Sequence, residues 1–203
     1  MTTSIQPAAA PPAPEIDAGQ ANGAARFPWR WLWVPLLVVF LFGGTYLLSW
    51  FDAYQLTERF VRDADDSYAA GSYLDALVGY QTFDPQVNQY VNVGGYLAVE
   101  RIWSARYSWP QPAAVEHARQ RSQEIIGQRL TITEAERYIR ANIGRPAPYF
   151  GEIYLRLGEL YEESGSLVDA REIYESIPNL FANRPDLIER AQEHLARLDI
   201  QSQ

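Results

Sequence analysis

The stretch YLRLGELYEESGSLVDAREIYESI, from Tyr154 to Ile177, decides the fold of this chain. In its first half, apolar side chains recur at spacings of three and four and share one helical face: Tyr154, Leu157, Leu160 and Tyr161. Gly165 ends that helix, because glycine accepts the left-handed backbone of a helix C-terminus. A second helical face follows: Leu167, Ala170, Ile173, Tyr174 and Ile177. Pro178 is expected to end it, which predicts an antiparallel pair of helices joined by a short turn.

The pair of helices resembles the tetratricopeptide repeat (TPR). The resemblance is carried by Tyr154, Leu157, Gly158, Tyr161, Gly165, Leu167, Ala170 and Tyr174. Small Gly158 and Ala170 are expected to let the two helices approach closely. Two positions depart from the family pattern, since Ile177 replaces a small residue and Pro178 comes early. The resemblance implies an α-solenoid of stacked helix pairs that binds other proteins; another kind of antiparallel helical hairpin is the alternative.

A repeat of this kind needs neighbours to cover its apolar face. The stretch FVRDADDSYAAGSYLDALVGYQTF, residues 60–83, repeats the second-helix pattern after Gly71: Tyr73, Ala76, Tyr80 and Phe83. Further on, Thr133 and Glu136 have the spacing of a capping box at a helix start. No strand alternation stands out, so we expect residues 52–203 to form an all-α, TPR-like domain.

The stretch WLWVPLLVVFLFGGTYLLSWF, residues 31–51, contains no charged residue. As a helix it spans ~31 Å, which matches a hydrocarbon core of ~30 Å. Tryptophan residues flank it at both ends, as expected at the two membrane interfaces: Trp29, Trp31, Trp33 and Trp50. We therefore predict a transmembrane anchor over residues 29–51. A buried core helix is the alternative, and a cleaved signal peptide is disfavoured because LLSWFDAY offers no small-x-small site.

The residues before and after the anchor predict the state of the N-terminal tail and the orientation of the chain in the membrane. Residues 1–28 are rich in Pro and Ala and are expected to be disordered. Arg30 borders the apolar run on one side and Asp52 on the other. This favours a single-pass protein of the plasma or inner membrane, with a cytoplasmic N-terminus and an extracytoplasmic C-terminal domain. The chain has no lysine, and we read this as the coding bias of a GC-rich bacterial genome.

Charge and composition exclude several functions. The net charge of −8 falls on the residues after Phe51, and an acidic domain repels nucleic acid. Without cysteine or lysine there is no disulfide, thiolate or lysine Schiff-base chemistry. His117 and His194 lack partners at metal-ligand spacing and are expected on the solvated surface, as are the many carboxylates. No phosphate loop or nucleophile motif occurs, so we expect no cofactor and no enzymatic activity.

The TPR resemblance implies that a partner binds along exposed positions of the first helix. Carried onto this chain, these groove positions are Glu152, Leu155, Arg156, Glu159 and Glu162. The acids among them predict a basic or amphipathic partner segment; the alternative is that they only face solvent. The function expected is a scaffold for membrane or envelope proteins. The competing prediction is an envelope glycan-binding module or hydrolase that uses Trp103, Trp109 and nearby acids.

Overall fold

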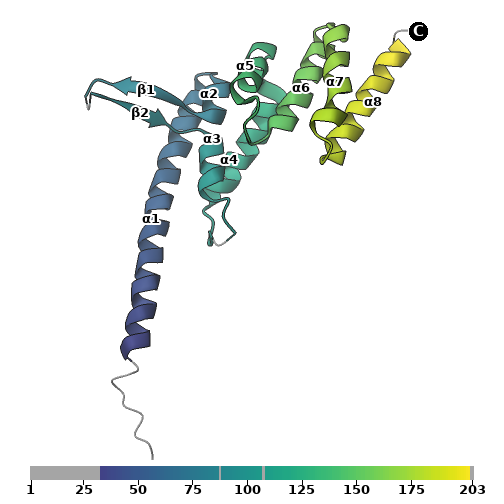
Figure 1. Cartoon of the computed structure of the whole chain (residues 1–203). Coiled ribbons are helices and arrows are strands. Elements are labelled where there is room, and N and C mark those ends of the chain that lie inside the picture. The colour runs from purple at the N-terminus through teal and green to yellow at the C-terminus, as the bar shows by residue number, and fades with distance from the viewer. Residues whose placement is uncertain (1–32, 87, 107, 202–203) are drawn as a thin grey trace, which may run out of the picture. The chain divides into compact units, whose positions relative to one another are not determined.

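The structure, a computed structural model, describes residues 33–86, 88–106 and 108–201. The expected tail, residues 1–28, and the predicted interface residues Trp29 and Trp31 lie outside this range. The described part is mostly helical, as expected (Figure 1). Its elements are α1 (Trp33–Ala69), α2 (Tyr73–Val78), β1 (Tyr80–Asp84), β2 (Gln89–Val93), α3 (Tyr96–Ile102), α4 (Ala113–Glu124), the π-helical turn η2 (Ile125–Arg129), α5 (Ile132–Asn142), α6 (Phe150–Glu163), α7 (Leu167–Leu180) and α8 (Pro185–Gln201).

Helix α1 is longer than the predicted anchor. It runs unbroken for 37 residues, because no glycine or proline interrupts the chain between Phe51 and Ala69. Its apolar part is long and apolar enough to cross a membrane, and none of that part is buried. At ~1.5 Å per residue the helix measures ~55 Å, well beyond a hydrocarbon core. The chain divides into two compact units between Tyr46 and Leu47, so the end of α1 belongs to the helical domain.

A β-hairpin replaces the second half of the helix expected near Phe83. Helix α2 ends at Val78 because Gly79 adopts φ +74°, and Tyr80 and Phe83 lie in β1. β1 pairs with β2 in antiparallel register, with Tyr80 opposite Val93. At its base the backbones cross closely: a Cβ on Gly95 would lie 2.3 Å from the Gly79 nitrogen. The all-α prediction is therefore wrong for residues 80–93.

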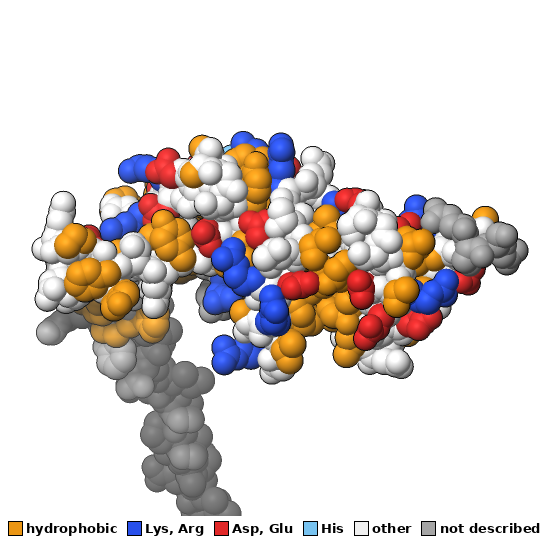
Figure 2. Space-filling view, turned by 90° about the horizontal axis from the view of Figure 1, so that it is seen from above, with side chains coloured by type: hydrophobic (Ala, Val, Ile, Leu, Met, Phe, Trp, Pro, Cys, Tyr) orange, Lys and Arg blue, Asp and Glu red, His pale blue; other side chains and the backbone are white. Residues whose placement is uncertain are grey.

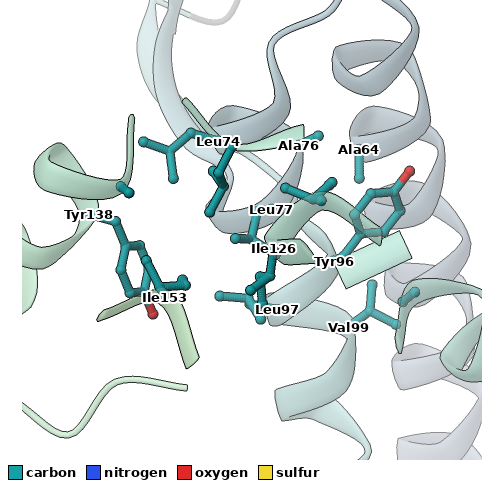
Figure 3. Close-up of a cluster of buried hydrophobic side chains, with 14 of the residues drawn as sticks. Ala64, Leu74, Ala76, Leu77, Tyr96, Leu97, Val99, Ile126, Tyr138 and Ile153 are labelled. Carbon is teal, nitrogen blue, oxygen red and sulfur yellow. The ribbon is translucent and has the colours of Figure 1, made fainter. Parts of the chain in front are cut away.

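The larger core gathers side chains from α1 through α6. Figure 3 shows Ala64 of α1, Leu77 of α2 and Tyr96 of α3 among the buried side chains that meet there. Trp103 is also buried, and its indole nitrogen donates a hydrogen bond to Oγ1 of buried Thr57 at 2.7 Å. Elements distant in sequence are thus fastened to the C-terminal part of α1.

The predicted helix pair forms α6 and α7, with Gly165 at φ +82° in the turn between them. Their close packing is confirmed: a Cβ on Gly158 would lie 2.6 Å from Cε1 of Tyr174. The expected stop at Pro178 is wrong, because α7 continues through it to Leu180. Proline lacks the N–H that would continue the helix hydrogen bonding, and only two residues of α7 follow Pro178.

A second core joins α6, α7 and α8. Its buried residues are Leu155, Ala170, Tyr174, Ile177, Leu187, Ala191 and Leu198. Helix α6 also contributes Ile153 and Leu157 to the larger core, so it packs on both sides.

The capping box of α5 lies two residues before the predicted one. Thr131 caps the helix, and the Thr131 backbone N–H donates to the Glu134 carboxylate at 3.0 Å. The same Thr-x-x-Glu spacing occurs at both positions. Buried Leu130 has an extended backbone, so the helix begins directly after it, at the Thr131–Glu134 pair.

Candidate functional site

A polar hollow of about 450 Å³ opens between α6 and α8. Its lining comprises Arg156, Glu159, Glu162, Glu163, His194 and Arg197, which we call the α6–α8 hollow. The α6 residues recur at three- and four-residue spacing and share a face of that helix. His194 and Arg197 are three apart on α8 and face it likewise.

Three of the sequence-predicted groove residues meet in this hollow: Arg156, Glu159 and Glu162. The expectation that Leu155 is an exposed groove residue is wrong. Leu155 has no exposed surface, because α7 and α8 cover it in the second core. Glu152 lies outside the hollow and pairs with Arg184 at 2.7 Å. Helix α8 therefore occupies part of the surface on which a partner segment was expected.

Arg156 organises the α6 side of the hollow. Its Nη1 lies 3.1 Å from Glu159 and 2.7 Å from Glu163, and only 13% of its side chain is exposed. Arg190 of α8 reaches Glu159 at 2.9 Å and ties the two helices together. The Nε of Arg156 is buried and has no hydrogen-bond partner among the described residues. Of these ion pairs, Arg156–Glu159 is the most shielded from solvent, with 13% and 17% of the two side chains exposed.

His194 organises the α8 side. Its Nδ1 lies 2.7 Å from Glu162, 3.0 Å from the Tyr174 hydroxyl and 2.6 Å from Arg197. Only 15% of the side chain is exposed, so the prediction of a solvated His194 is wrong. The amphipathic pattern placed His194 on the polar face of its helix, but that face turns toward α6.

The charge of Glu162 is stabilised within this group. Burial alone would raise its pKa, but hydrogen bonds from His194 and Tyr174 and the Arg197 charge outweigh burial and lower it. The pKa of Tyr174 is raised, first by burial and then by its hydrogen bond to Glu162. At neutral pH the hollow therefore presents ionised Glu162 beside a neutral tyrosine hydroxyl.

The α6–α8 hollow carries charges of both signs. Its lining has the acids Glu159, Glu162 and Glu163 against the arginines Arg156 and Arg197. Figure 2 shows acidic and basic side chains interspersed over the face it displays, with hydrophobic side chains between them.

Sequence reasoning missed Glu163, Arg190, His194 and Arg197. Glu163 had a signal, since it lies seven positions after Arg156 and returns to nearly the same face of the helix. The residues of α8 had no such signal. Their place in the hollow depends on how α8 packs against α6, which helical periodicity does not specify.

His117 also has an acidic partner. It lies 3.0 Å from Asp65, which accepts a hydrogen bond from Tyr96. The His117 side chain is 39% exposed, so it is partly solvated as predicted but fixed between α1 and α4. Within the described residues, no group of three or more His, Asp and Glu side chains could hold a metal ion.

The two tryptophans proposed for sugar stacking do not form one surface. Trp103 is 3% exposed and lies in the core, whereas Trp109 is 76% exposed. Of the predicted membrane-interface residues, Trp33 is exposed and Trp50 is half-buried. Trp50 stacks on Tyr54, and its indole nitrogen donates to the Pro110 carbonyl at 3.0 Å. Trp103 is thus unavailable to a sugar ring.

Comparison of the chain with protein-family models, curated proteins and solved structures found no match. The TPR resemblance therefore rests on the residues of α6 and α7 alone.

Proposed function

We propose that this protein is a non-catalytic, membrane-anchored scaffold. Residues 29–51 span the membrane, and the helical domain, built as a TPR-like stack, binds another membrane or envelope protein. The observation that carries the proposal is the apolar part of α1, which has no buried residue and continues without a break into the helical domain. An uncovered apolar helix of this length is stable in a hydrocarbon environment and costly in water.

The anchor defines how such a scaffold acts. A domain held at a bilayer meets partners in the same membrane at a high effective concentration, so a modest docking surface suffices. The orientation that we propose follows the residues flanking the apolar run, with Arg30 on the cytoplasmic side and Asp52 on the other.

The partner segment that we propose is basic or amphipathic and docks at the α6–α8 hollow. Glu163 lies at its rim, where 60% of the side chain is exposed. A lysine or arginine of the partner would compete with Arg156 for Glu163, exchanging an internal ion pair for one between chains. Such an exchange changes affinity modestly and specificity more.

The anchor also offers a face for helix packing within the membrane. No atom of the described residues lies within 4 Å of a Cβ built on Gly43 or Gly44, so another helix can approach closely there. If the protein is an accessory subunit of a larger membrane complex, Gly44→Ile removes this face and releases the subunit. Unchanged co-purification of Gly44→Ile would reject that version of the proposal.

Site-specific photocrosslinking in native membranes tests the scaffold function. A photoreactive residue replaces Glu163 at the hollow or, as a matched control, Glu175 on α7, whose side chain is similarly exposed at 59%. We expect a defined adduct with one membrane protein from position 163 and none from position 175. A second arm places the photoreactive group at Arg197, a further lining residue, and adds Glu163→Arg, which should reduce the adduct.

The crosslinking outcomes distinguish the scaffold function from the recognition of charge at the hollow. Identical adducts from positions 163 and 175, or a protein recovered only as a free monomer in mild detergent, would contradict the scaffold function. An adduct from position 197 that Glu163→Arg leaves unchanged would retain the scaffold but reject charge recognition.

A further inference from the structure

We propose that the connection between α3 and α4 is a second membrane contact, which places Trp109 in the lipid headgroup region at the level of Trp50. We call residues 104–106 and 108–112 the interface loop. The inference rests on the proposed membrane span of α1 and adds to it a lipid-binding surface on the helical domain. Figure 1 shows this connection extending beyond the ends of α3 and α4.

Two hydrogen bonds fix the level of the interface loop along α1. At its start, Trp103 donates to Thr57 at 2.7 Å. Near its other end, the Pro110 carbonyl accepts from Trp50 at 3.0 Å. The interval from Thr57 to Trp50 is ~10 Å along the helix axis, so the loop descends by that much toward the N-terminal end of α1.

Trp50 marks where α1 leaves the apolar run. Phe51 is the last residue of the uncharged stretch and Asp52 is the first charge after it. Tryptophan prefers the headgroup level, where its ring is partly dehydrated and its N–H still finds a partner. A segment of the chain that is hydrogen-bonded to the Trp50 side chain therefore lies at the same headgroup level.

The composition of the interface loop suits an anionic bilayer surface. Trp109 precedes Pro110 and is 76% exposed, an unusual exposure for so large an apolar side chain. Arg101 and Arg106 are also exposed, and residues 101–115 contain no acid although the domain as a whole is acidic. Arginine attracts lipid phosphate, and tryptophan buries its ring among the upper acyl carbons.

The loop is held in place by its own contacts. Gln111 donates a side-chain hydrogen bond to the Trp103 carbonyl at 3.1 Å, and Trp50 meets Trp103 edge to face with ring centroids 6.0 Å apart. Trp109 is thus presented from a loop braced at both ends. A braced aromatic residue enters an interface without the entropy cost of ordering a free loop.

The chain offers a clean way to measure this contact, because it contains no cysteine. Single cysteines carry an environment-sensitive fluorophore in the full chain, reconstituted into phosphatidylcholine vesicles with a minority of phosphatidylglycerol and of lipid with a headgroup-linked nitroxide. The test variant is Trp109→Cys. The matched control is Val168→Cys, which replaces another strongly exposed apolar residue, 81% exposed on α7. Leu36→Cys in the apolar run reports on the anchor itself.

We expect the nitroxide to quench the label at position 109 at least about twofold more than the label at position 168, with a blue-shifted emission at 109. Equal quenching at 109 and 168, with a lipid-exposed label at 36, would overturn the interface loop and retain the anchor. An aqueous label at position 36 would reject the membrane span instead. A circular dichroism spectrum matching the parent chain establishes that Trp109→Cys folds.

A second measurement tests the lipid chemistry while keeping Trp109 in place. In the full chain labelled at Ser108→Cys, Arg106→Gln should reduce quenching in vesicles containing phosphatidylglycerol more than in vesicles of phosphatidylcholine alone. Equal quenching of the parent and Arg106→Gln in both vesicle types would overturn the part assigned to anionic lipid.

Discussion

The indole nitrogen of Trp103 donates a hydrogen bond to Oγ1 of Thr57, and both side chains are buried. The Thr57 hydroxyl in turn donates to the Ala53 carbonyl at 2.8 Å. One hydroxyl thus serves as donor to its own helix and as acceptor for the end of α3. This arrangement fastens the helical domain to the part of α1 that follows the apolar run.

Replacing Thr57 with valine keeps the shape of the side chain but removes the acceptor. The buried Trp103 nitrogen then has no partner, and we expect a loss of ~1–3 kcal/mol in the free energy of unfolding. Urea unfolding in detergent, followed by tryptophan fluorescence, measures it. Thr45→Val is the matched control, because Thr45 also donates to the carbonyl four residues earlier, that of Leu41. Similar losses in both variants would contradict a special role for Thr57.

Gly158 allows α6 to lie directly against the ring of Tyr174. In Gly158→Ala the added Cβ would sit 2.6 Å from Cε1 of Tyr174, so the helices must separate or the ring must move. Overpacking of this kind costs ~1–3 kcal/mol of unfolding free energy. Gly127→Ala is the control, since a Cβ there meets nothing within 4 Å and should raise stability by ~0.4–1 kcal/mol. A stabilised Gly158→Ala would show that α6 and α7 are packed more loosely.

The α6–α7 pair was predictable because its signals are local. Apolar spacing fixes the buried faces, Gly165 fixes the turn, and Gly158 fixes the close approach. The apolar run of α1 was predictable for the same reason.

The β-hairpin had weaker signals that the helical pattern of Tyr73 and Ala76 obscured. Tyr80, Thr82 and Phe83 favour strands, and Pro85 interrupts any helix before Val91 and Val93. Its base depends on the contact of Gly79 with Gly95, which joins two positions distant in sequence.

Only the α6 side of the α6–α8 hollow could be predicted from the sequence. The TPR resemblance implied Arg156, Glu159 and Glu162 as groove positions on the first helix of the pair. It could not predict that α8 would cover Leu155 and bring His194 to Glu162, because tertiary packing sets that register.

The lowered pKa of Glu162 predicts an acid-sensitive contribution to stability. A folded-state pKa below the ordinary value of 4.5 stabilises the fold above that pH, and the contribution disappears as pH falls through the folded-state value. We expect Glu162→Gln to cost ~1 kcal/mol of unfolding free energy near neutral pH. The difference from the parent chain should shrink below pH 4.5. Denaturant titrations across this range measure it, with exposed Glu175→Gln as control. A difference that does not vary with pH would contradict the assignment.

Charge placed in the middle of the apolar run tests whether α1 spans a bilayer. Phe40 is 78% exposed in the structure, so substitution there disrupts no packing within the described chain. An arginine at the centre of a spanning helix costs ~2.5–3.5 kcal/mol on insertion scales. Phe40→Arg combined with Leu41→Arg should therefore move much of the protein from the membrane pellet to the alkaline wash. Phe83→Arg combined with Tyr90→Arg adds the same charge on the exposed β-hairpin and should leave the protein in the pellet. If both double variants fractionate alike, the apolar run does not hold the chain in the membrane, because charge at its centre would then cost no more than charge in water.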